Sequence, residues 1–413
     1  MHAIRHILTL LVLAIFLGAC AQRISHDQVV LWTAFEGPEL ESLQVQISDF
    51  EKQSGQKVSL LKVPFASLQR KVLVAGPALQ GPDILIGPHD WIGLLETAGL
   101  LAPIPDSVLE NLEGDVYSVA QQAVTYDEQN YSVPMMMDCV VLARNTELCP
   151  NSPQDIGGLV KEALRCQDEP NDALGFAYEL DNLYFTWPFL AGFGTDFLDP
   201  FSRKALDLEA LNFQTNSAKE GIEWVSDLRL RHKLVLPGMK NQDAVDLFLN
   251  KKLGMMLCGP WNLGAIKKAG IPYILEPLPS GPRAESSPFV GVTGAMLNKH
   301  SLNKPGVEEL LQFLGSKETS SLLCKASGRA PARKSSESHL KTILSEEASI
   351  RDLLLFSKAA QKGTPLPNHP ALSAVWAPLE EALELITTGQ SQASEELART
   401  TERVRTKIRF MTE

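Results

Sequence analysis

The chain has 413 residues, of which 44% are hydrophobic and 21% are charged, a balance typical of a globular protein and not of a disordered or fibrous one. Its formal net charge is −11 at pH 7. A chain this acidic lacks the basic surface of a nucleic-acid-binding protein, so we expect no nucleic-acid partner.

The first twenty residues have the pattern of an export signal. Arg5 precedes an apolar run over 7–16, and a Leu-Gly-Ala-Cys sequence ends at Cys20. A basic start, a short apolar middle and a small-residue exit are typical of a secretory signal peptide, and the run is too short for a comfortable membrane span. A cysteine directly after Leu-Gly-Ala is the bacterial lipobox pattern. An ordinary signal peptide or an uncleaved anchor is the alternative.

We therefore expect residues 1–19 to be a lipoprotein signal peptide and residues 20–28 to be the lipidated N-terminus and a polar linker. The protein would be exported and anchored by lipid on Cys20. It would lie in the periplasm or on the outer face of the cell membrane.

Strand and helix patterns alternate after the linker. Val29–Thr33 is typical of a buried strand, Pro38 then begins a helix with one apolar face, and Gly55 ends it. The next predicted elements are strands over 57–63 and 83–86 and helices over 67–74 and 89–98. This β-α-β-α-β order indicates a parallel sheet that is covered by helices on both faces.

The same alternation returns beyond residue 140, so the chain is expected to form two α/β lobes. Strands are predicted over 253–258 and 289–297, and the Pro- and Gly-rich run 277–288 is predicted to be a loop between the two lobes. From Val307 onward the pattern is almost entirely helical.

The cysteines leave one pairing open. With Cys20 lipidated, five thiols remain, so at least one must be unpaired. Cys149 and Cys166 flank one predicted helix and could form a disulfide in an oxidising compartment, although the spacing alone does not determine connectivity. No Cys-x-x-Cys motif occurs, and His89 and His369 are most simply loop or core residues. We expect neither a metal ion nor a cofactor.

Three aromatic stretches follow one another along the chain: Tyr184-Phe185-Thr186-Trp187-Pro188, then Gly259-Pro260-Trp261, then Pro367-Asn368-His369-Pro370 leading to Trp376. A ring held by neighbouring proline and glycine residues is a rigid apolar plate with a polar edge. Several such plates in one cleft suit a ligand with C–H faces and hydroxyl rims, such as a sugar. Taken singly, an aromatic ring in a chain of this length belongs to the core more often than to a site, and Trp187 is more typical of the core than of a ligand contact.

In the local sequence and the order of these stretches, the chain resembles the maltose/maltodextrin-binding proteins of ABC importers, within the type II periplasmic-binding fold. The resemblance covers about residues 28–410. The segments that carry it are 49–58, 81–90, 184–188, 259–261, 288–292 and 367–376. It implies an α/β protein with two lobes that close on an oligosaccharide in the cleft between them.

The resemblance also implies limits for the lobes. The first lobe would comprise residues 29–138 and 293–338. The second lobe would comprise residues 139–292 and the helical segment 339–413. The partners would be an oligosaccharide and the transmembrane subunits of a permease, and we expect the receptor itself to be a monomer.

Four aromatic positions match the family's sugar-binding positions. Tyr184, Trp261 and Trp376 resemble the stacking aromatics of the second lobe, and Phe185 resembles their neighbour. Such rings would cover the C–H faces of a sugar.

The polar positions match less closely. Asp90 resembles a first-lobe carboxylate that accepts hydrogen bonds from sugar hydroxyls, although it could simply cap a helix. Asp138 stands where the family usually has a glutamate near the hinge, and Glu36 is a possible hydroxyl acceptor in the first loop. Gly87 replaces a family tryptophan, and Trp91 could supply a ring from a shifted position.

Further departures from the family pattern are Gln69 and Arg70, Asn182, and Glu380. The aromatic positions of the second lobe therefore match the family, whereas several polar positions of the first lobe differ from it. A short α-glucan is the first expectation for the ligand, and another di- or oligosaccharide is the alternative.

Two other classes of function were weighed against a sugar receptor. A glycoside hydrolase would need two carboxyl groups facing each other across the scissile bond, and nothing local marks Asp90 or Asp138 as a proton donor. The chain has no Gly-x-Ser-x-Gly, His-Glu-x-x-His, phosphate-loop or dinucleotide motif, so we expect no enzyme activity. The remaining alternative is a receptor of the same fold for a non-sugar solute such as a peptide, polyamine or metal complex.

Overall fold

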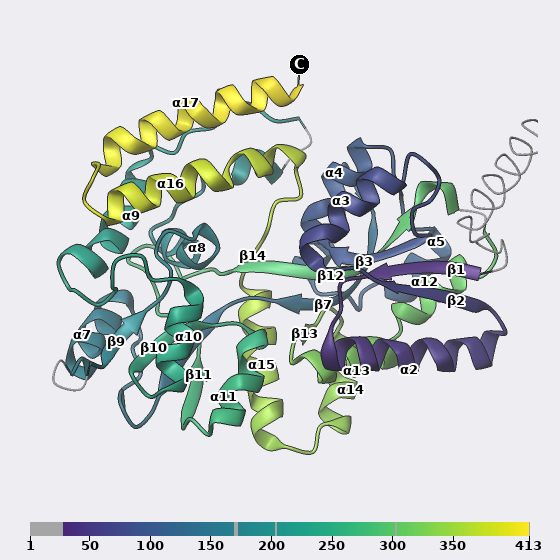
Figure 1. The fold of residues 1–413 in the computed structure, drawn as a ribbon, viewed down its shortest axis with the longest axis horizontal. Helices are drawn as coiled ribbons and strands as arrows, with labels where there is room; N and C mark the ends of the chain where they lie inside the picture. The colour runs from purple at the N-terminus through teal and green to yellow at the C-terminus, as the bar shows by residue number, and fades with distance from the viewer. Residues whose placement is uncertain (1–27, 169–171, 203–204, 302–303, 413) are drawn as a thin grey trace, which may run out of the picture.

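The computed structural model describes residues 28–168, 172–202, 205–301 and 304–412. The predicted signal peptide, Cys20 and the linker before residue 28 lie outside the described residues. Two β-sheets stand next to each other, each surrounded by helices (Figure 1). Of the helices that the structure describes, none combines the length and the apolar character needed to cross a bilayer.

The larger sheet contains eight strands. Along its main path they are β13 (Ala330–Pro331), β7 (Ser132–Asp138), β12 (Phe289–Asn298), β3 (Ile84–Pro88), β1 (Gln28–Thr33) and β2 (Lys57–Lys62). The short strands β4 (Leu101–Ala102) and β14 (Thr364–Pro365) also pair with β12. Strand β1 is parallel to β2 and β3, whereas β12 is antiparallel to β3 and β7. The predicted parallel unit is present, and antiparallel strands from later in the chain extend it.

The smaller sheet contains four strands, in the order β11 (Tyr273–Glu276), β8 (Val141–Asn145), β10 (Leu253–Cys258) and β9 (Leu174–Ala177). Strand β10 is parallel to β9, and β8 is antiparallel to both β10 and β11. A separate hairpin is formed by β5 (Thr125–Tyr126) and β6 (Gln129–Asn130).

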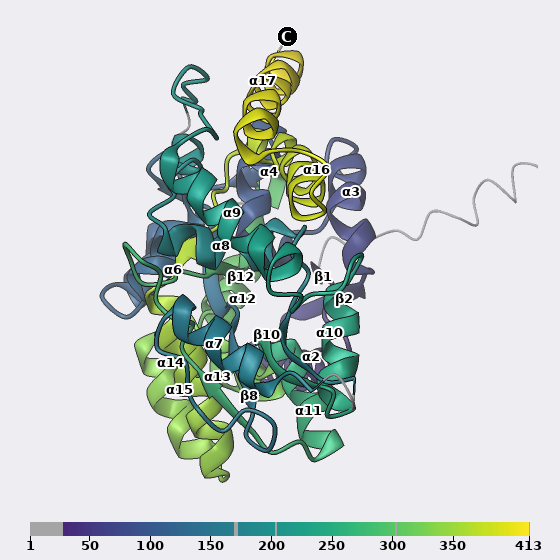
Figure 2. The same ribbon diagram turned by 90° about the vertical axis from the view of Figure 1, so that its left-hand side faces the viewer.

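Helices surround both sheets. Those near the larger sheet are α2 (Gly37–Ser54), α3 (Phe65–Ala75), α4 (Ile92–Thr97), α5 (Asp106–Leu109), α6 (Ser118–Val124), α12 (Val307–Leu314), α13 (Lys317–Ser327) and α14 (Lys334–Ile343). Helix α15 (Glu347–Gln361) contacts strands of both sheets. The others are α7 (Ile156–Cys166), α8 (Leu183–Gly192), α9 (Asn216–Leu230), α10 (Asn241–Leu249), α11 (Leu263–Ala269), α16 (Trp376–Thr387) and α17 (Ala393–Thr412). Helices α16 and α17 lie side by side at one edge, next to α9 (Figure 1, Figure 2).

Short 3-10 helices connect several of these elements. They are η1 (His89–Trp91), η2 (Glu110–Leu112), η4 (Asp199–Ser202), η5 (Pro260–Asn262), η6 (Lys299–Ser301) and η7 (Pro370–Ala374). The single helix predicted over 89–98 is thus two elements, η1 followed by α4. The first turn is tighter than an α-turn because the backbone N–H of Ile92 bonds to the carbonyl of His89, three residues earlier.

Strand β1 shows why the larger sheet is covered on both faces. Val29 and Leu31 belong to one buried hydrophobic cluster, together with residues of α2 and α12. Val30 and Trp32 belong to the other cluster, together with residues of α3 and α4. Successive side chains of a strand point to opposite faces, so both faces are buried, as predicted (Figure 1).

Helix α2 follows its sequence signals closely. Pro38 lies in its first turn, and Gly55 ends it in the left-handed conformation with a φ of 77°. Leu43, Ile47 and Phe50 are buried on the face that packs against the larger sheet. The predicted start, end and buried face of this helix are confirmed.

The chain passes between the two sheets at neighbouring points. Strand β7 leads through Cys139 and Val140 into β8, and the loop 277–288 leads from β11 back into β12. Strand β14 lies beside the start of β12 before the chain continues to α16. The lobe limits expected at 138/139, 292/293 and 338/339 stay predictions; within the described residues, β12 pairs with strands of the larger sheet on both sides of Val292.

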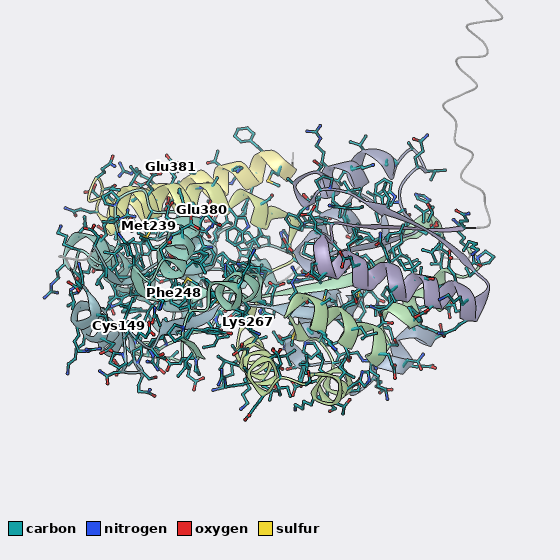
Figure 3. The ribbon with its side chains drawn as sticks, turned by 60° about the horizontal axis from the view of Figure 1, so that its bottom comes forward. Cys149, Met239, Phe248, Lys267, Glu380 and Glu381 are labelled. Carbon is teal, nitrogen blue, oxygen red and sulfur yellow. A yellow bond between two sulfur atoms is a disulfide. The ribbon has the colours of Figure 1, made fainter. Side chains whose placement is uncertain are left out.

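Cys149 and Cys166 form a disulfide, which confirms the pairing that the sequence left open. The bond lies in the smaller-sheet half of the molecule, where Figure 3 labels Cys149. The free cysteines among the described residues are Cys139, Cys258 and Cys324, all buried. Burial raises the pKa of each of these three thiols, so they are poor nucleophiles in the folded protein.

Replacing Cys166 with serine should lower the free energy of unfolding by about 3 kcal/mol, because the bond closes a loop between residues 17 positions apart. Thiol titration in denaturant, on a variant that begins at residue 28, should detect three thiols before reduction and five after it. Five reactive thiols before reduction would show that the pair is not formed.

Candidate functional site

A cavity of about 350 Å³ lies where the two halves of the molecule meet. Its lining residues are Ala34, Phe35, Glu39, Phe65, Leu68, Ile86, Gly87, Pro88, Asp90, Trp91, Asp138, Tyr184, Trp261, Gly291, Val292, Thr293, Arg329 and Leu366. Most of them belong to the larger sheet and its helices, whereas Tyr184 and Trp261 belong to helices next to the smaller sheet. Five of the eight predicted ligand-binding residues therefore line one cavity: Asp90, Trp91, Asp138, Tyr184 and Trp261.

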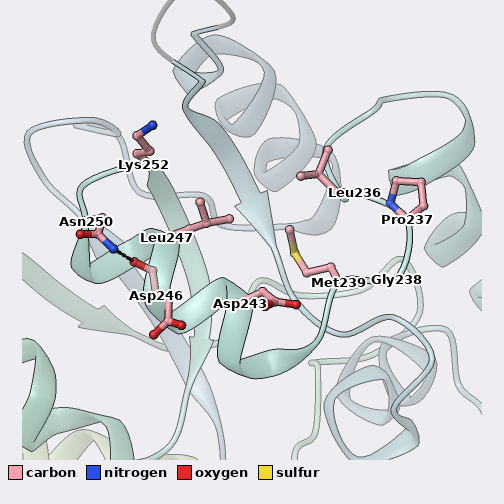
Figure 4. Close-up of a pocket in the computed structure, with 9 residues that line it drawn as sticks. All are labelled: Leu236, Pro237, Gly238, Met239, Asp243, Asp246, Leu247, Asn250 and Lys252. Carbon is pink, nitrogen blue, oxygen red and sulfur yellow. Dashed lines mark hydrogen bonds between the residues drawn. The ribbon is translucent and has the colours of Figure 1, made fainter.

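A larger and more open hollow, of about 660 Å³, is formed only by residues between Leu236 and Lys252 (Figure 4). Two of its polar side chains already have partners: the Asn250 amide donates a hydrogen bond to the backbone oxygen of Asp246 at 2.8 Å, and Asp243 accepts one from the backbone N–H of Lys240 before α10. None of the predicted site residues lies there. We therefore place the candidate site in the cavity between the two halves.

Trp261 is held at the cavity by the turn after β10. Pro260 begins the 3-10 helix η5, and the Asn262 side-chain oxygen accepts a hydrogen bond from the backbone N–H of Gly259 at 3.0 Å. A Cβ atom on Gly259 would collide with the indole, so the glycine lets the ring lie against the backbone. The Trp261 side chain is nevertheless 46% exposed. A large aromatic ring left this open in a cavity is available to a ligand.

Tyr184 stands at the start of α8, where Asn182 caps the helix by accepting a hydrogen bond from the Tyr184 N–H at 3.0 Å. The Tyr184 ring lies 6.4 Å from the Trp261 ring and 6.2 Å from the Phe289 ring, centre to centre. Its hydroxyl is buried without a hydrogen-bond partner among the described residues, and burial raises its pKa well above the usual value. A ligand that bonds to this hydroxyl would remove the cost of leaving it unpaired.

Glu380, one of the departures from the family pattern, supports α8. It lies on α16 beside Glu381 (Figure 3) and accepts a hydrogen bond from the backbone of Leu183. A carboxylate at a helix N-terminus is favourable because it faces unpaired N–H groups and the positive end of the helix dipole. Burial raises the pKa of the Glu380 carboxyl. Glu380 therefore faces the start of the helix that carries Tyr184 and does not line the cavity.

Three charged side chains from the larger-sheet half form a connected group. Glu39 lies in the first turn of α2, Asp138 ends β7, and Arg329 lies between α13 and β13. The Nη1 atom of Arg329 is 3.1 Å from Oε1 of Glu39, and its Nε atom is 3.6 Å from Oδ2 of Asp138. Burial raises the pKa of both carboxyl groups, and the guanidinium partly opposes this rise. Together they offer hydrogen-bond acceptors and donors to a ligand rich in hydroxyl groups.

The same group is a poor site for a metal ion, because a guanidinium already stands between Glu39 and Asp138. The one group of three potential metal ligands found among the described residues is Cys149, Glu162 and Cys166. Its two thiols form the disulfide and cannot act as thiolate ligands.

Asp90 lies in η1 next to His89, which is buried and joins three segments. The backbone N–H of Val292 donates a hydrogen bond to Nδ1 of His89 at 3.0 Å, so Nε2 carries the proton and donates to the Leu366 carbonyl at 2.9 Å. His89 is thus a core residue, one of the two roles expected for it. Burial raises the pKa of the Asp90 carboxyl.

Trp91 lines the cavity but is only 7% exposed. Its ring lies 5.5 Å from the ring of Phe65, tilted by 33°. A Cβ atom at Gly87 would stand 3.2 Å from the Trp91 ring, so the glycine leaves room for the indole to pack against the backbone of β3. Phe65 is 62% exposed and presents far more of its ring than Trp91 does.

Three predicted residues do not line the cavity. The Glu36 side chain is 67% exposed and forms an ion pair with Lys62 at 2.7 Å. Phe185 is buried, with its ring nearly perpendicular to that of Tyr184 at 5.4 Å. Trp376 begins α16 and packs against the aromatic core behind the cavity. A contact between any of these three and a ligand stays a prediction.

The structure adds residues that the sequence did not single out. Glu39 lies on the cavity three positions after Glu36, the acid predicted from the same loop. Phe65 is the first residue of α3, two residues before the start of the helix predicted over 67–74, and its exposure depends on how that helix packs. Arg329 follows a glycine at the end of α13 with no motif around it, and only the fold brings it to Glu39 and Asp138.

Replacing Asp90 with asparagine should raise the melting temperature at pH 7, because a raised pKa means that the ionised carboxylate destabilises the folded protein. The ordinary pKa of an aspartate is about 4, and that of Asp90 in the folded protein is higher. As the pH falls through the folded-state pKa, Asp90 of the folded wild type becomes protonated. The difference in melting temperature between the variant and wild type should therefore shrink. Calorimetry between pH 4 and 8 measures both.

The exposed Asp196 provides a matched control, since an asparagine there should change the melting temperature little at any pH. An Asp90→Asn variant that is less stable than wild type at pH 7 would show that the carboxylate has a stabilising partner.

The chain was compared with known proteins. Residues 46–348 match the family described as bacterial extracellular solute-binding proteins. The galactooligosaccharide-binding protein of Bacillus subtilis (strain 168) is 24% identical over 391 residues, covering 93% of this chain and 90% of that protein. The maltotriose-binding protein of Pyrococcus abyssi (strain GE5 / Orsay) is 25% identical over 366 residues, covering 87% of this chain and 77% of that protein.

A solved structure of a cyclo/maltodextrin-binding protein complexed with maltotetraose superposes with a TM-score of 0.81 and 27% identity, over 92% of this chain and 97% of that one. This likeness confirms the predicted α/β fold with two lobes. The family match extends over most of the chain. The chain belongs to the family of bacterial extracellular solute-binding proteins.

Proposed function

We propose that this protein is the solute receptor of an ABC sugar importer and that it binds a maltodextrin-type oligosaccharide in the cavity. The main support for the proposal is that four groups line one cavity. They are the exposed indole of Trp261, the unpaired hydroxyl of Tyr184 and the carboxylates of Glu39 and Asp138. A sugar ring packs its C–H face on an aromatic ring and donates hydroxyl hydrogen bonds to carboxylates. The maltotriose- and maltodextrin-binding relatives support this ligand class.

The alternative within the same class is another di- or oligosaccharide. The relative from Bacillus subtilis is named for galactooligosaccharides, and the aromatic and acidic groups of the cavity suit those sugars as well. A receptor for a non-sugar solute such as a polyamine is less favoured, because Arg329 already neutralises part of the acidic group.

Binding would be coupled to closure of the two lobes. Tyr184 and Trp261 come from the smaller-sheet half, and Glu39 and Asp138 come from the larger-sheet half. A ligand that makes both sets of contacts only in the closed form stabilises that form by its differential affinity. The permease would then receive the closed, loaded receptor.

The proposal places the protein outside the cytoplasm. The pattern over residues 1–19 supports export, lipid on Cys20 would tether the domain to the membrane, and the family is described as extracellular. The receptor would act as a monomer in the periplasm or on the outer face of the cell membrane.

We also propose that the bound sugar is not hydrolysed. A glycoside hydrolase uses a pair of carboxyl groups, one of which donates a proton to the leaving group. Here Arg329 lies between Glu39 and Asp138, so both are arranged as hydrogen-bond acceptors. Chromatography of maltotriose after incubation with the protein tests this point, and shortened products would overturn it.

Replacing Trp261 with alanine should weaken maltotriose binding by about 2 kcal/mol, roughly 30-fold, because a desolvated aromatic contact is lost. The melting temperature should change little, since the side chain is 46% exposed. Isothermal titration calorimetry with maltotriose, a galactotriose and spermidine measures affinity and ligand class together.

Phe410 offers a control for loss of an exposed ring, because it is 74% exposed on α17 and does not line the cavity. Phe410→Ala should bind maltotriose as wild type does. Equal affinity of the Trp261 and Phe410 variants, or wild type that responds only to spermidine, would contradict the proposed function.

A further inference from the structure

We infer that Phe65 is a second stacking residue for the sugar, so that aromatic rings from both halves of the molecule hold the ligand. This inference rests on the proposed function and deepens it by adding a binding residue on the larger-sheet wall of the cavity. Phe65 would thus take the stacking role that the sequence pattern suggested for Trp91.

The position of Phe65 is set by the start of α3. Pro64, with a φ of −54°, precedes the helix, and its carbonyl accepts a hydrogen bond from the backbone N–H of Ser67 at 2.9 Å. Phe65 is the first residue of the helix and lines the cavity with 62% of its surface exposed. A large ring with this exposure in a cavity is available to a ligand, and covering it would bury apolar surface.

The Phe65 ring packs against Trp91, which is itself buried. Trp91 is 7% exposed and belongs to the same buried cluster as Leu68 and Ile92. The two rings lie 5.5 Å apart, centre to centre, with a tilt of 33°. Phe65 therefore packs on a ring that cannot move easily, and the rest of its surface stays open to the cavity.

Exposure alone does not distinguish Phe65, because Val74 on the same helix is 72% exposed. Val74, however, does not line the cavity, and it has no ring to stack. Trp261 enters the cavity from the smaller-sheet half, whereas Phe65 enters it from the larger-sheet half. A pyranose has two C–H faces, so rings on both walls suit a sugar better than a single ring would.

The test compares maltotriose affinities by isothermal titration calorimetry in a matched series. Phe65→Ala should bind about tenfold more weakly than wild type, Phe65→Leu should recover little of the loss, and Phe65→Trp should recover most of it. Val74→Ala, which removes an equally exposed side chain from the same helix, should bind as wild type does. Melting temperatures of all variants check that each is folded.

The outcomes separate the inference from the proposed function. If wild type binds maltotriose and Phe65→Ala stays within twofold of Val74→Ala, the inference is wrong and the proposed function stands. Full recovery with leucine would also overturn it, because any apolar side chain would then serve. If wild type binds no saccharide, the proposed function and the inference fail together.

Discussion

The candidate site depends on one constraint, which is that the cavity and the connections between the two sheets share residues. Asp138 is the last residue of β7, directly before the chain crosses to the smaller sheet. Val292 and Leu366 line the cavity and are both hydrogen-bonded to His89. A ligand in the cavity therefore touches the segments about which the halves would have to move. The proposed coupling of binding and closure would therefore act through this shared backbone and needs no distant relay.

The polar groups of the cavity lower stability in the absence of a ligand. The carboxyl groups of Glu39, Asp90 and Asp138 have raised pKa values because of burial, and the Tyr184 hydroxyl has no partner among the described residues. Their surroundings are otherwise well packed, since Trp187 and Phe289 stack at 4.8 Å and nearly parallel behind the cavity. An unpaired hydroxyl and carboxyl groups of raised pKa next to a rigid aromatic core suit a receptor whose ligand supplies further hydrogen bonds.

Local sequence patterns predicted the elements whose limits depend on neighbouring residues, such as α2, β10 and the helix that the disulfide spans. They also located the aromatic and acidic segments that reach the cavity. They did not distinguish Glu39 from Glu36, or Phe65 from Trp91, because which of two nearby side chains is exposed depends on how distant elements pack against them. Arg329 could not be predicted at all, since its two partners lie far away in sequence and no local motif marks it.

The most direct test of the central claim is a crystal structure of the domain with maltotriose bound. We expect a glucosyl ring against the Trp261 indole, with sugar hydroxyls within hydrogen-bond distance of Asp138 or Glu39 and the two lobes closed around it. Maltotriose bound outside this cavity, or bound in it without touching the larger-sheet half, would show that the proposed site is wrong.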